Sequence, residues 1–170
     1  PSVGQFFAEL GAAVIKVENP ATGGDVTRRW TLPTEDAAAE RSAYFAAANW
    51  GKQSVAIDLR RAEGQRLLRA LAAQADIVVS SYTPGAAARL GADFETLAAR
   101  NPRLLYAEVV GYPQGSPGSD RAGYDAVVQA ESGFTFMNGE AGGPPVKMPV
   151  ALVDVLAAHQ LKEALLVGLL

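Results

Sequence analysis

The 170-residue sequence contains no cysteine and only one histidine. Without cysteine there is no disulfide, no thiolate nucleophile and no cysteine-ligated metal, and a reducing cytoplasm is the expected compartment. The single histidine, His159, gives little support to a histidine-based triad or metal site. We therefore expect no bound metal, and we look for chemistry among the carboxylates, the basic side chains and the hydroxyl groups.

Three further features are missing. The formal net charge is −3, so no excess of positive charge indicates nucleic acid or an anionic membrane as a partner. No GxGxxG fingerprint occurs, which disfavours a nicotinamide or flavin site. The apolar C-terminal segment carries Asp154, Lys162 and Glu163 within its length, which argues against a membrane span. These absences leave small molecules as the expected partners.

Strand and helix patterns alternate along the chain with short connections. Apolar runs predict strands at 12–18, 54–59, 76–82 and 103–112. Helical patterns occupy 2–10, 44–49, 61–74, 93–101, 124–137 and the segment from 152 onward. The alternation predicts an α/β fold of the Rossmann-like type, with a doubly wound, mostly parallel sheet and flanking helices.

Two packing expectations follow from these patterns. The almost continuous apolar run at 76–82 predicts a strand that is buried on both faces. The inner face of the helix at 61–74 is expected to consist of Leu67, Leu68, Leu71 and Ala75.

Both ends of the chain lie inside periodic apolar patterns, so we expect an internal piece of a longer protein.

Asp154 lies at the start of the long C-terminal helical pattern, and two interpretations of it compete. It is either an acid that caps the helix, at about 0.5–2 kcal/mol, or a nucleophilic carboxylate held at a helix terminus. On this segment alone capping is the more common role of such a residue.

Polar clusters follow the predicted strands, where ligands bind in doubly wound sheets. Arg28 lies in a Gly/Pro-containing loop with a neighbouring arginine, and Lys52 precedes the second strand. Ser81, Tyr82 and Arg89 follow the third strand, and Tyr124 and Asp125 open a later helix. Guanidinium groups and glycine-rich backbone can bind phosphate, and a tyrosine ring can stack on a nucleotide base. Each feature taken alone is a weak signal, and solvated charge, turn formation, helix capping or packing is its more common explanation.

Taken together and in order, six segments resemble the class III CoA-transferases, the family that includes formyl-CoA transferase and carnitine CoA-transferase and has α-methylacyl-CoA racemase as a relative. The segments are GAAVIKVENPATGGDVTR, NWGKQSVAIDL, ADIVVSSYTPGAAARLG, NPRLLYAEVVGY, RAGYDAVVQAESGF and GGPPVKMPVALVD. The resemblance implies that residues 1–170 are part of the large, CoA-binding domain. It also implies that the start of that domain and a small C-terminal domain lie outside the chain, and that the whole protein is an interlocked homodimer.

The resemblance also implies roles for individual residues. Asp154 matches the aspartate that forms an acyl anhydride and then an aspartyl-CoA thioester, with an acyl-CoA thioester as co-substrate and a carboxylic acid as acceptor. Arg28 and Lys52 match residues at the CoA nucleotide, and Arg89 matches the arginine that follows the family's Pro-Gly turn and is expected to bind CoA or substrate. Ser81 and Tyr82 stand where relatives often carry Asn-Phe. Tyr124 and Asp125 match positions close to the substrate.

Two alternatives to a transferase stay open at this point. The racemase branch carries histidine at the position of Tyr124, and tyrosine, with an ordinary pKa of about 10, is a poor base at neutral pH. The other alternative is a non-catalytic α/β module that binds CoA or serves assembly, in which Asp154 only caps its helix. The acyl group and the acceptor acid do not follow from these residues.

Overall fold

The computed structural model describes residues 1–36, 38, 39 and 41–170, leaving out only Ala37 and Glu40. The described residues form a mixed α/β protein that divides into two compact units. The first unit comprises residues 1–78 and 88–104, and the second comprises residues 79–87 and 105–170. Each unit has its own buried residues.

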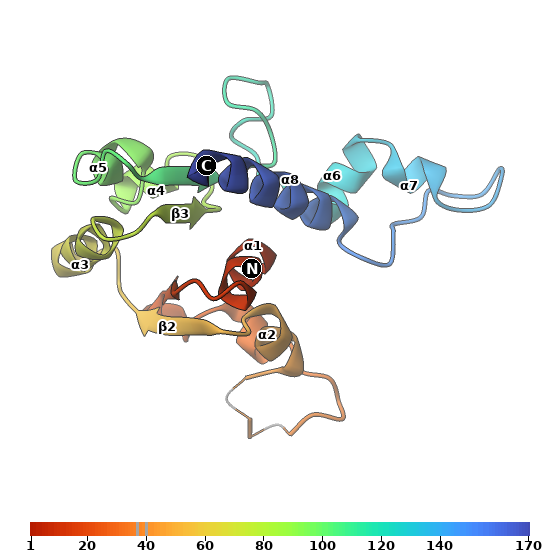
Figure 1. The fold of residues 1–170 in the computed structure, drawn as a ribbon. Helices are drawn as coiled ribbons and strands as arrows, with labels where there is room; N and C mark the ends of the chain where they lie inside the picture. Colours follow the sequence, from red (N-terminus) through yellow and green to blue (C-terminus); the bar gives the residue numbers. More distant parts are fainter. Residues whose placement is uncertain (37, 40) are drawn as a thin grey trace. The chain divides into compact units, whose positions relative to one another are not determined.

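A parallel pair of strands forms the sheet of the first unit. Helix α1 (Ser2–Glu9) leads into β1 (Val14–Glu18), and β2 (Lys52–Ala56) pairs with β1 from Val14↔Lys52 to Glu18↔Ala56 (Figure 1). The pairing extends one residue further, because the N–H of Ile57 donates to the carbonyl of Glu18 at 2.9 Å. This register brings the loop after β1 next to the end of β2.

Three short helices lie between these strands: η1 (Pro20–Thr22), η2 (Val26–Arg29) and α2 (Ala43–Ala48). Each begins after a side chain that accepts a backbone N–H of its first turn, and these capping residues are Asn19, Asp25 and Ser42. Capping residues of this kind satisfy N–H groups that have no partner inside a helix. Local polar contacts therefore stabilise the starts of these three short helices.

The first unit has further helices and a small apolar core. These helices are α3 (Ala62–Ala72) and α5 (Phe94–Ala98), and the second half of α4 (Ala86–Arg89) also belongs to this unit. The buried apolar residues of this unit include Val3, Phe45, Ile57, Leu59, Ala72, Ala92, Leu97 and Leu104. Gly64 lets α3 approach the end of β2, because a Cβ there would lie 2.1 Å from the carbonyl oxygen of Asp58.

The second unit contains most of the other sheet and the longest helix. Strands β3 (Ile77–Ser80) and β4 (Leu105–Glu108) form a two-stranded sheet, and the N–H of Val109 donates to the carbonyl of Ser80. The chain then passes through α6 (Asp125–Glu131) and α7 (Phe134–Met137) before it returns to the start of α8 (Leu152–Leu169) (Figure 1). Helix α8 packs against α6 and β4.

The structure corrects several expectations from the sequence. Among the described residues the four strands form two separate pairs, not one continuous doubly wound sheet. Strand β3 is short, and Val79 is 44% exposed, so this strand is not buried on both faces. Leu67 is also exposed, which removes it from the inner face of α3. The helix expected at 124–137 is broken at Gly133, whose φ of 87° ends α6 and starts α7.

Candidate functional site

Asp154 is the third residue of α8, and another acid caps this helix. The N-cap position is Ala151, which has no side chain for the task. Instead, Oδ1 of Asp125 on α6 accepts the backbone N–H groups of Val153 at 2.9 Å and Asp154 at 3.3 Å. These are the two N–H groups that an N-cap side chain normally satisfies. Asp125 therefore caps α8 from a neighbouring helix.

The Asp154 carboxylate itself takes no part in this capping. The side chain is exposed, and within residues 1–36, 38, 39 and 41–170 it makes no hydrogen bond or ion pair. Partial desolvation and the negative charge of Asp125 raise the pKa of Asp154 above its ordinary value. A carboxylate that is more basic and makes no hydrogen bonds is a better nucleophile than one that is fully solvated or paired.

The other predicted residues of the second unit contribute differently. Tyr124 is 76% exposed and occupies the N-cap position of α6 without a side-chain capping bond. Tyr82 is half-buried, and desolvation raises the pKa of its phenol. Ser81 is exposed. Among the described side chains, no hydrogen bond joins Ser81, Tyr82 or Tyr124 to Asp154, so the structure brings together only Asp125 and Asp154 of the five.

Arg28, in the first unit, is held by a carboxylate that the sequence did not single out. Its Nε and Nη2 atoms donate to the two oxygens of Glu18 at 2.8 and 2.7 Å, and its guanidinium lies 4.0 Å from the centre of the Phe45 ring. Glu18 is 6% exposed and also accepts Ser54 Oγ at 2.6 Å and the N–H of Asp25 at 2.8 Å. The hydrogen bonds from Arg28, helped by the other two donors, lower the pKa of Glu18 to about 2 despite its burial.

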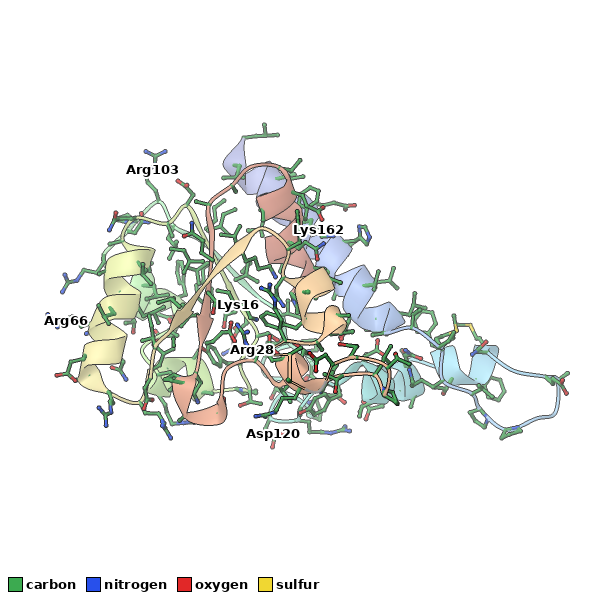
Figure 2. All side chains as sticks on the ribbon, turned by 90° about the horizontal axis from the view of Figure 1, so that it is seen from below. Lys16, Arg28, Arg66, Arg103, Asp120 and Lys162 are labelled. Carbon is green, nitrogen blue, oxygen red and sulfur yellow. The ribbon has the colours of Figure 1, made fainter. Side chains whose placement is uncertain are left out.

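A second ion pair adjoins this one. Lys16 Nζ donates to Asp25 Oδ2 at 2.6 Å, and Asp25 Oδ1 accepts the N–H and the hydroxyl of Thr27. Burial acts to raise the pKa of Asp25, but these hydrogen bonds outweigh it and lower the pKa to about 2. We call Lys16, Glu18, Asp25 and Arg28 the charged cluster; Figure 2 labels Lys16 and Arg28, its two basic members. The four charges balance one another.

Lys52 and Arg89 differ in how much of their charge is available. Lys52 Nζ donates to three oxygens, on Pro1, Ala48 and Asn49, at 2.7–2.9 Å. Desolvation, with a smaller effect of the nearby Lys16 charge, lowers the pKa of Lys52 to about 8. Arg89 is exposed at the end of α4, and its guanidinium makes no hydrogen bond or ion pair in the described part of the chain. Of the three predicted basic residues, Arg89 is the one that offers a whole guanidinium to a ligand.

A pocket of about 220 Å³ opens beside the charged cluster. It is lined by residues of β1, of the loop that follows and of β2: Glu18, Pro20, Gly23, Gly24, Arg28, Ser54 and Ala56. Gly24 is required there, because its φ is +85° and a Cβ would lie 2.5 Å from Oε2 of Glu18. The pocket combines an ionised carboxylate with its paired guanidinium, so it offers polarity without net charge.

Two residues that the sequence did not single out carry much of this organisation. Glu18 holds Arg28, and Gln129 on α6, which has no exposed surface, donates to Asp125 Oδ2 at 2.6 Å. The available signals were weak: an acid at a strand end that precedes a Gly-Gly loop, and a glutamine four residues after an aspartate on a helix.

In the described ranges no three His, Asp or Glu side chains gather in a way that would hold a metal ion. The same ranges contain no helix with the length and apolar character of a membrane span.

Comparison with known proteins identifies the class to which this fold and these residues belong. The chain matches CoA-transferase family III over residues 1–170, and it belongs to that family. The succinate–glutarate CoA-transferase of Agrobacterium fabrum is 44% identical over 158 residues, which cover 91% of this chain and 39% of that protein. A formyl-CoA:oxalate CoA-transferase of Escherichia coli is 36% identical over 172 residues, which cover 100% of this chain and 40% of that protein.

Solved structures agree with the sequence comparison. The crystal structure of a CAIB/BAIF family protein from Brucella suis superposes with a TM-score of 0.92 at 40% identity, covering 99% of this chain and 44% of that one. The resemblance inferred from the six sequence segments is thereby confirmed at the level of the family. The chain spans about two fifths of the length of these two curated relatives.

Proposed function

We propose that this chain supplies the nucleophile and part of the CoA site of an enzyme that transfers CoA from an acyl-CoA to a carboxylic acid. The observation that carries the proposal is the state of Asp154: an exposed carboxylate in the first turn of α8, with a raised pKa and no hydrogen bond or ion pair in the described part of the chain. Family membership supports the same chemistry.

The reaction proceeds through two anhydrides and one enzyme thioester. An oxygen of Asp154 attacks the thioester carbonyl of the donor, and the C–S bond breaks to give a mixed anhydride and CoA thiolate. The thiolate attacks the aspartyl carbonyl of the anhydride, which releases the donor acid as a carboxylate and leaves an aspartyl-CoA thioester. The acceptor carboxylate then attacks this thioester and forms a second anhydride with release of CoA thiolate. Attack of the thiolate on the acceptor carbonyl produces the new acyl-CoA and regenerates Asp154.

Within the first unit, we propose that Arg89 provides the principal contact to a CoA phosphate. Its guanidinium is available, and guanidinium groups bind phosphate through two parallel hydrogen bonds. Lys52 adds positive charge, but its Nζ already donates to three oxygens of the protein itself. Arg28 shapes the pocket through its pair with Glu18. In the second unit, we propose that Ser81, Tyr82 and Tyr124 line the path of the acyl-CoA.

The relatives suggest which acids to test. Their names include succinate, glutarate and oxalate, which are short dicarboxylates. We propose short dicarboxylic acids as acceptors and their CoA thioesters as donors. We also propose that the full-length protein is a cytoplasmic homodimer.

Mass spectrometry of the full-length protein tests the proposal. The protein is incubated with succinyl-CoA, glutaryl-CoA and formyl-CoA in turn, and hydroxylamine is added to trap activated carboxylates. A hydroxamate on Asp154 is the expected result. Tight CoA binding with no modification of Asp154 by any of the three donors would instead indicate a non-catalytic module, and exchange of the α-proton of the acyl group without transfer would indicate a racemase.

A further inference from the structure

Gln129 is the most completely buried polar residue of the second unit, and every polar atom of its side chain is used. It has 0% of its surface exposed. Its Nε2 donates to Asp125 Oδ2 at 2.6 Å and to the carbonyl of Val150 at 3.1 Å, and its Oε1 accepts the N–H of Met148 at 2.9 Å. A buried amide with all of these bonds formed holds its partners in one arrangement, since breaking any bond leaves a buried polar group unsatisfied.

The partners of Gln129 are the parts that set the start of α8. Met148 and Val150 belong to the segment that enters the helix, and the N–H of Leu152 donates to the carbonyl of Val150. Asp125 is the residue whose other oxygen caps Val153 and Asp154. Gln129 thus fixes both the backbone that leads to Asp154 and the carboxylate that occupies the N–H groups next to it.

Occupation of those N–H groups limits the hydrogen bonds that the Asp154 carboxylate can make within its own helix terminus. An acid at the third position of a helix can fold back onto unsatisfied N–H groups of the same helix terminus. In this structure Asp125 satisfies the N–H groups of Val153 and Asp154, and the Asp154 carboxylate makes no hydrogen bond among the described residues. A rotated or displaced Asp125 would open those positions to Asp154 itself.

We propose that Gln129 is a positioning residue for acyl transfer: its amide locks Asp125 onto the first N–H groups of α8 and so keeps the Asp154 carboxylate available to the substrate. This inference rests on the proposed function, because it assigns Gln129 a part in the same reaction. Gln129 has no exposed surface, so its effect reaches the substrate only through Asp125 and α8.

Two substitutions in the full-length protein test the proposal. Gln129→Met keeps the length of the side chain but removes the donors and the acceptor. Gln129→Glu removes the donors when ionised but restores one donor to Asp125 when it holds a proton, because two carboxylates this close share a single proton. The ionisable groups that this network brings together are Asp125 on α6 and Asp154 on α8. Gln160→Glu, an exposed change on α8, is the matched charge control.

The rate of acyl transfer to Asp154 and the KM for succinyl-CoA are measured from pH 5 to pH 9 for each variant, together with the melting temperature. We expect Gln129→Met to lower kcat by about 10- to 100-fold at every pH with little change in KM, as expected for a misplaced nucleophile. We expect Gln129→Glu to lose a similar factor at high pH and to recover as the pH falls. Gln160→Glu should retain the profile of the unmodified protein.

Three results would overturn the inference. These are unchanged kcat in both Gln129 variants whatever their melting temperatures, a rise in KM at unchanged kcat, and the same pH profile in Gln129→Glu and Gln160→Glu. If Gln129→Met does not fold, the comparison of the two glutamate variants decides alone. A failure of the proposed function is recognised separately, because the unmodified protein would then form no adduct on Asp154, and the inference would fall with it.

Discussion

Glu18 and Asp154 are both carboxylates at the end of a secondary-structure element, and the protein treats them in opposite ways. Glu18 is 6% exposed and accepts four hydrogen bonds, two of them from Arg28. Asp154 is exposed, and its carboxylate accepts none from the described residues. The pKa of Glu18 is lowered to about 2, whereas that of Asp154 is raised. A carboxylate whose oxygens are all bonded stabilises structure, and one that is left unbonded is available for chemistry.

In each case a neighbouring residue accounts for the difference in hydrogen bonding and pKa. The Arg28 guanidinium covers both oxygens of Glu18. Near Asp154, Asp125 takes the backbone donors that would otherwise attract the Asp154 carboxylate, and its negative charge helps raise the pKa of Asp154. Four predictions follow from this contrast, and each tests a role that it assigns to a charged residue.

The largest expected effect is on activity at Asp154. In the full-length protein, Asp154→Asn should lower the rate of acyl transfer by at least about a thousandfold, because the amide cannot form the anhydride. Hydroxylamine trapping should then give no hydroxamate at this position. Glu163→Gln, another exposed acid on α8, serves as the control and should transfer at the normal rate. Retention of more than about a tenth of the activity by Asp154→Asn would show that another group is the nucleophile.

The next effect is on stability at Glu18. Glu18→Gln leaves the Arg28 guanidinium beside a neutral partner in a buried site, which should lower the free energy of unfolding by about 3 kcal/mol. Urea denaturation measures the change. Adding Arg28→Met should recover part of the loss, because the unpaired charge is then removed.

A matched variant distinguishes the effect of burial on stability from the effect of ion pairing. Asp58 also pairs with an arginine through two hydrogen bonds, but Arg60 is 62% exposed. Asp58→Asn should therefore destabilise the protein much less than Glu18→Gln does. Equal losses for the two variants would contradict the assignment of Glu18 to a structural role.

The third effect concerns the arginine that the structure leaves available. Arg89→Ala should raise the KM for succinyl-CoA about tenfold with an unchanged melting temperature, because the lost contact is one charge-assisted hydrogen-bonded pair to phosphate. Steady-state kinetics at two salt concentrations measure the effect, which should shrink at high salt. Arg66→Ala removes the same charge from α3, where Figure 2 labels Arg66, and should leave KM unchanged. A similar rise in both variants would indicate a general effect of net charge.

The sequence predicted the family and most of the elements, because these depend on local pattern and on ordered segments. Helix α8 and the position of Asp154 in its first turn were expected, and the structure contains both. The capping of α8 was not predicted, since it comes from Asp125, 29 residues earlier in the chain. Local sequence favours an acid that caps its own helix, and only tertiary packing assigns the task to an acid on another.

The charged cluster shows the same limit. Arg28 was expected to contact phosphate, because two arginines near a Gly-Gly pair are typical of anion sites. Its pairing with Glu18 depends on the turn of the chain at Gly24 and on the arrival of Ser54 from β2. These contacts join positions 10 and 36 residues apart, a separation over which sequence pattern carries no information on partners.

The smallest expected effect is on stability at Asp154, and it has the opposite sign to that at Glu18. The raised pKa of Asp154 means that its ionisation favours the unfolded chain, so its contribution to stability improves as the pH falls through that pKa. The lowered pKa of Glu18 means that its contribution is complete above about pH 4.5 and is lost as the pH falls toward about 2. Asp154→Asn should accordingly stabilise the full-length protein at pH 7, by about 0.5 kcal/mol, while it abolishes transfer. Urea denaturation at pH 7 and pH 4 measures the gain, which should be smaller at the lower pH; a loss of stability at pH 7 would mean that the Asp154 carboxylate holds the helix together after all.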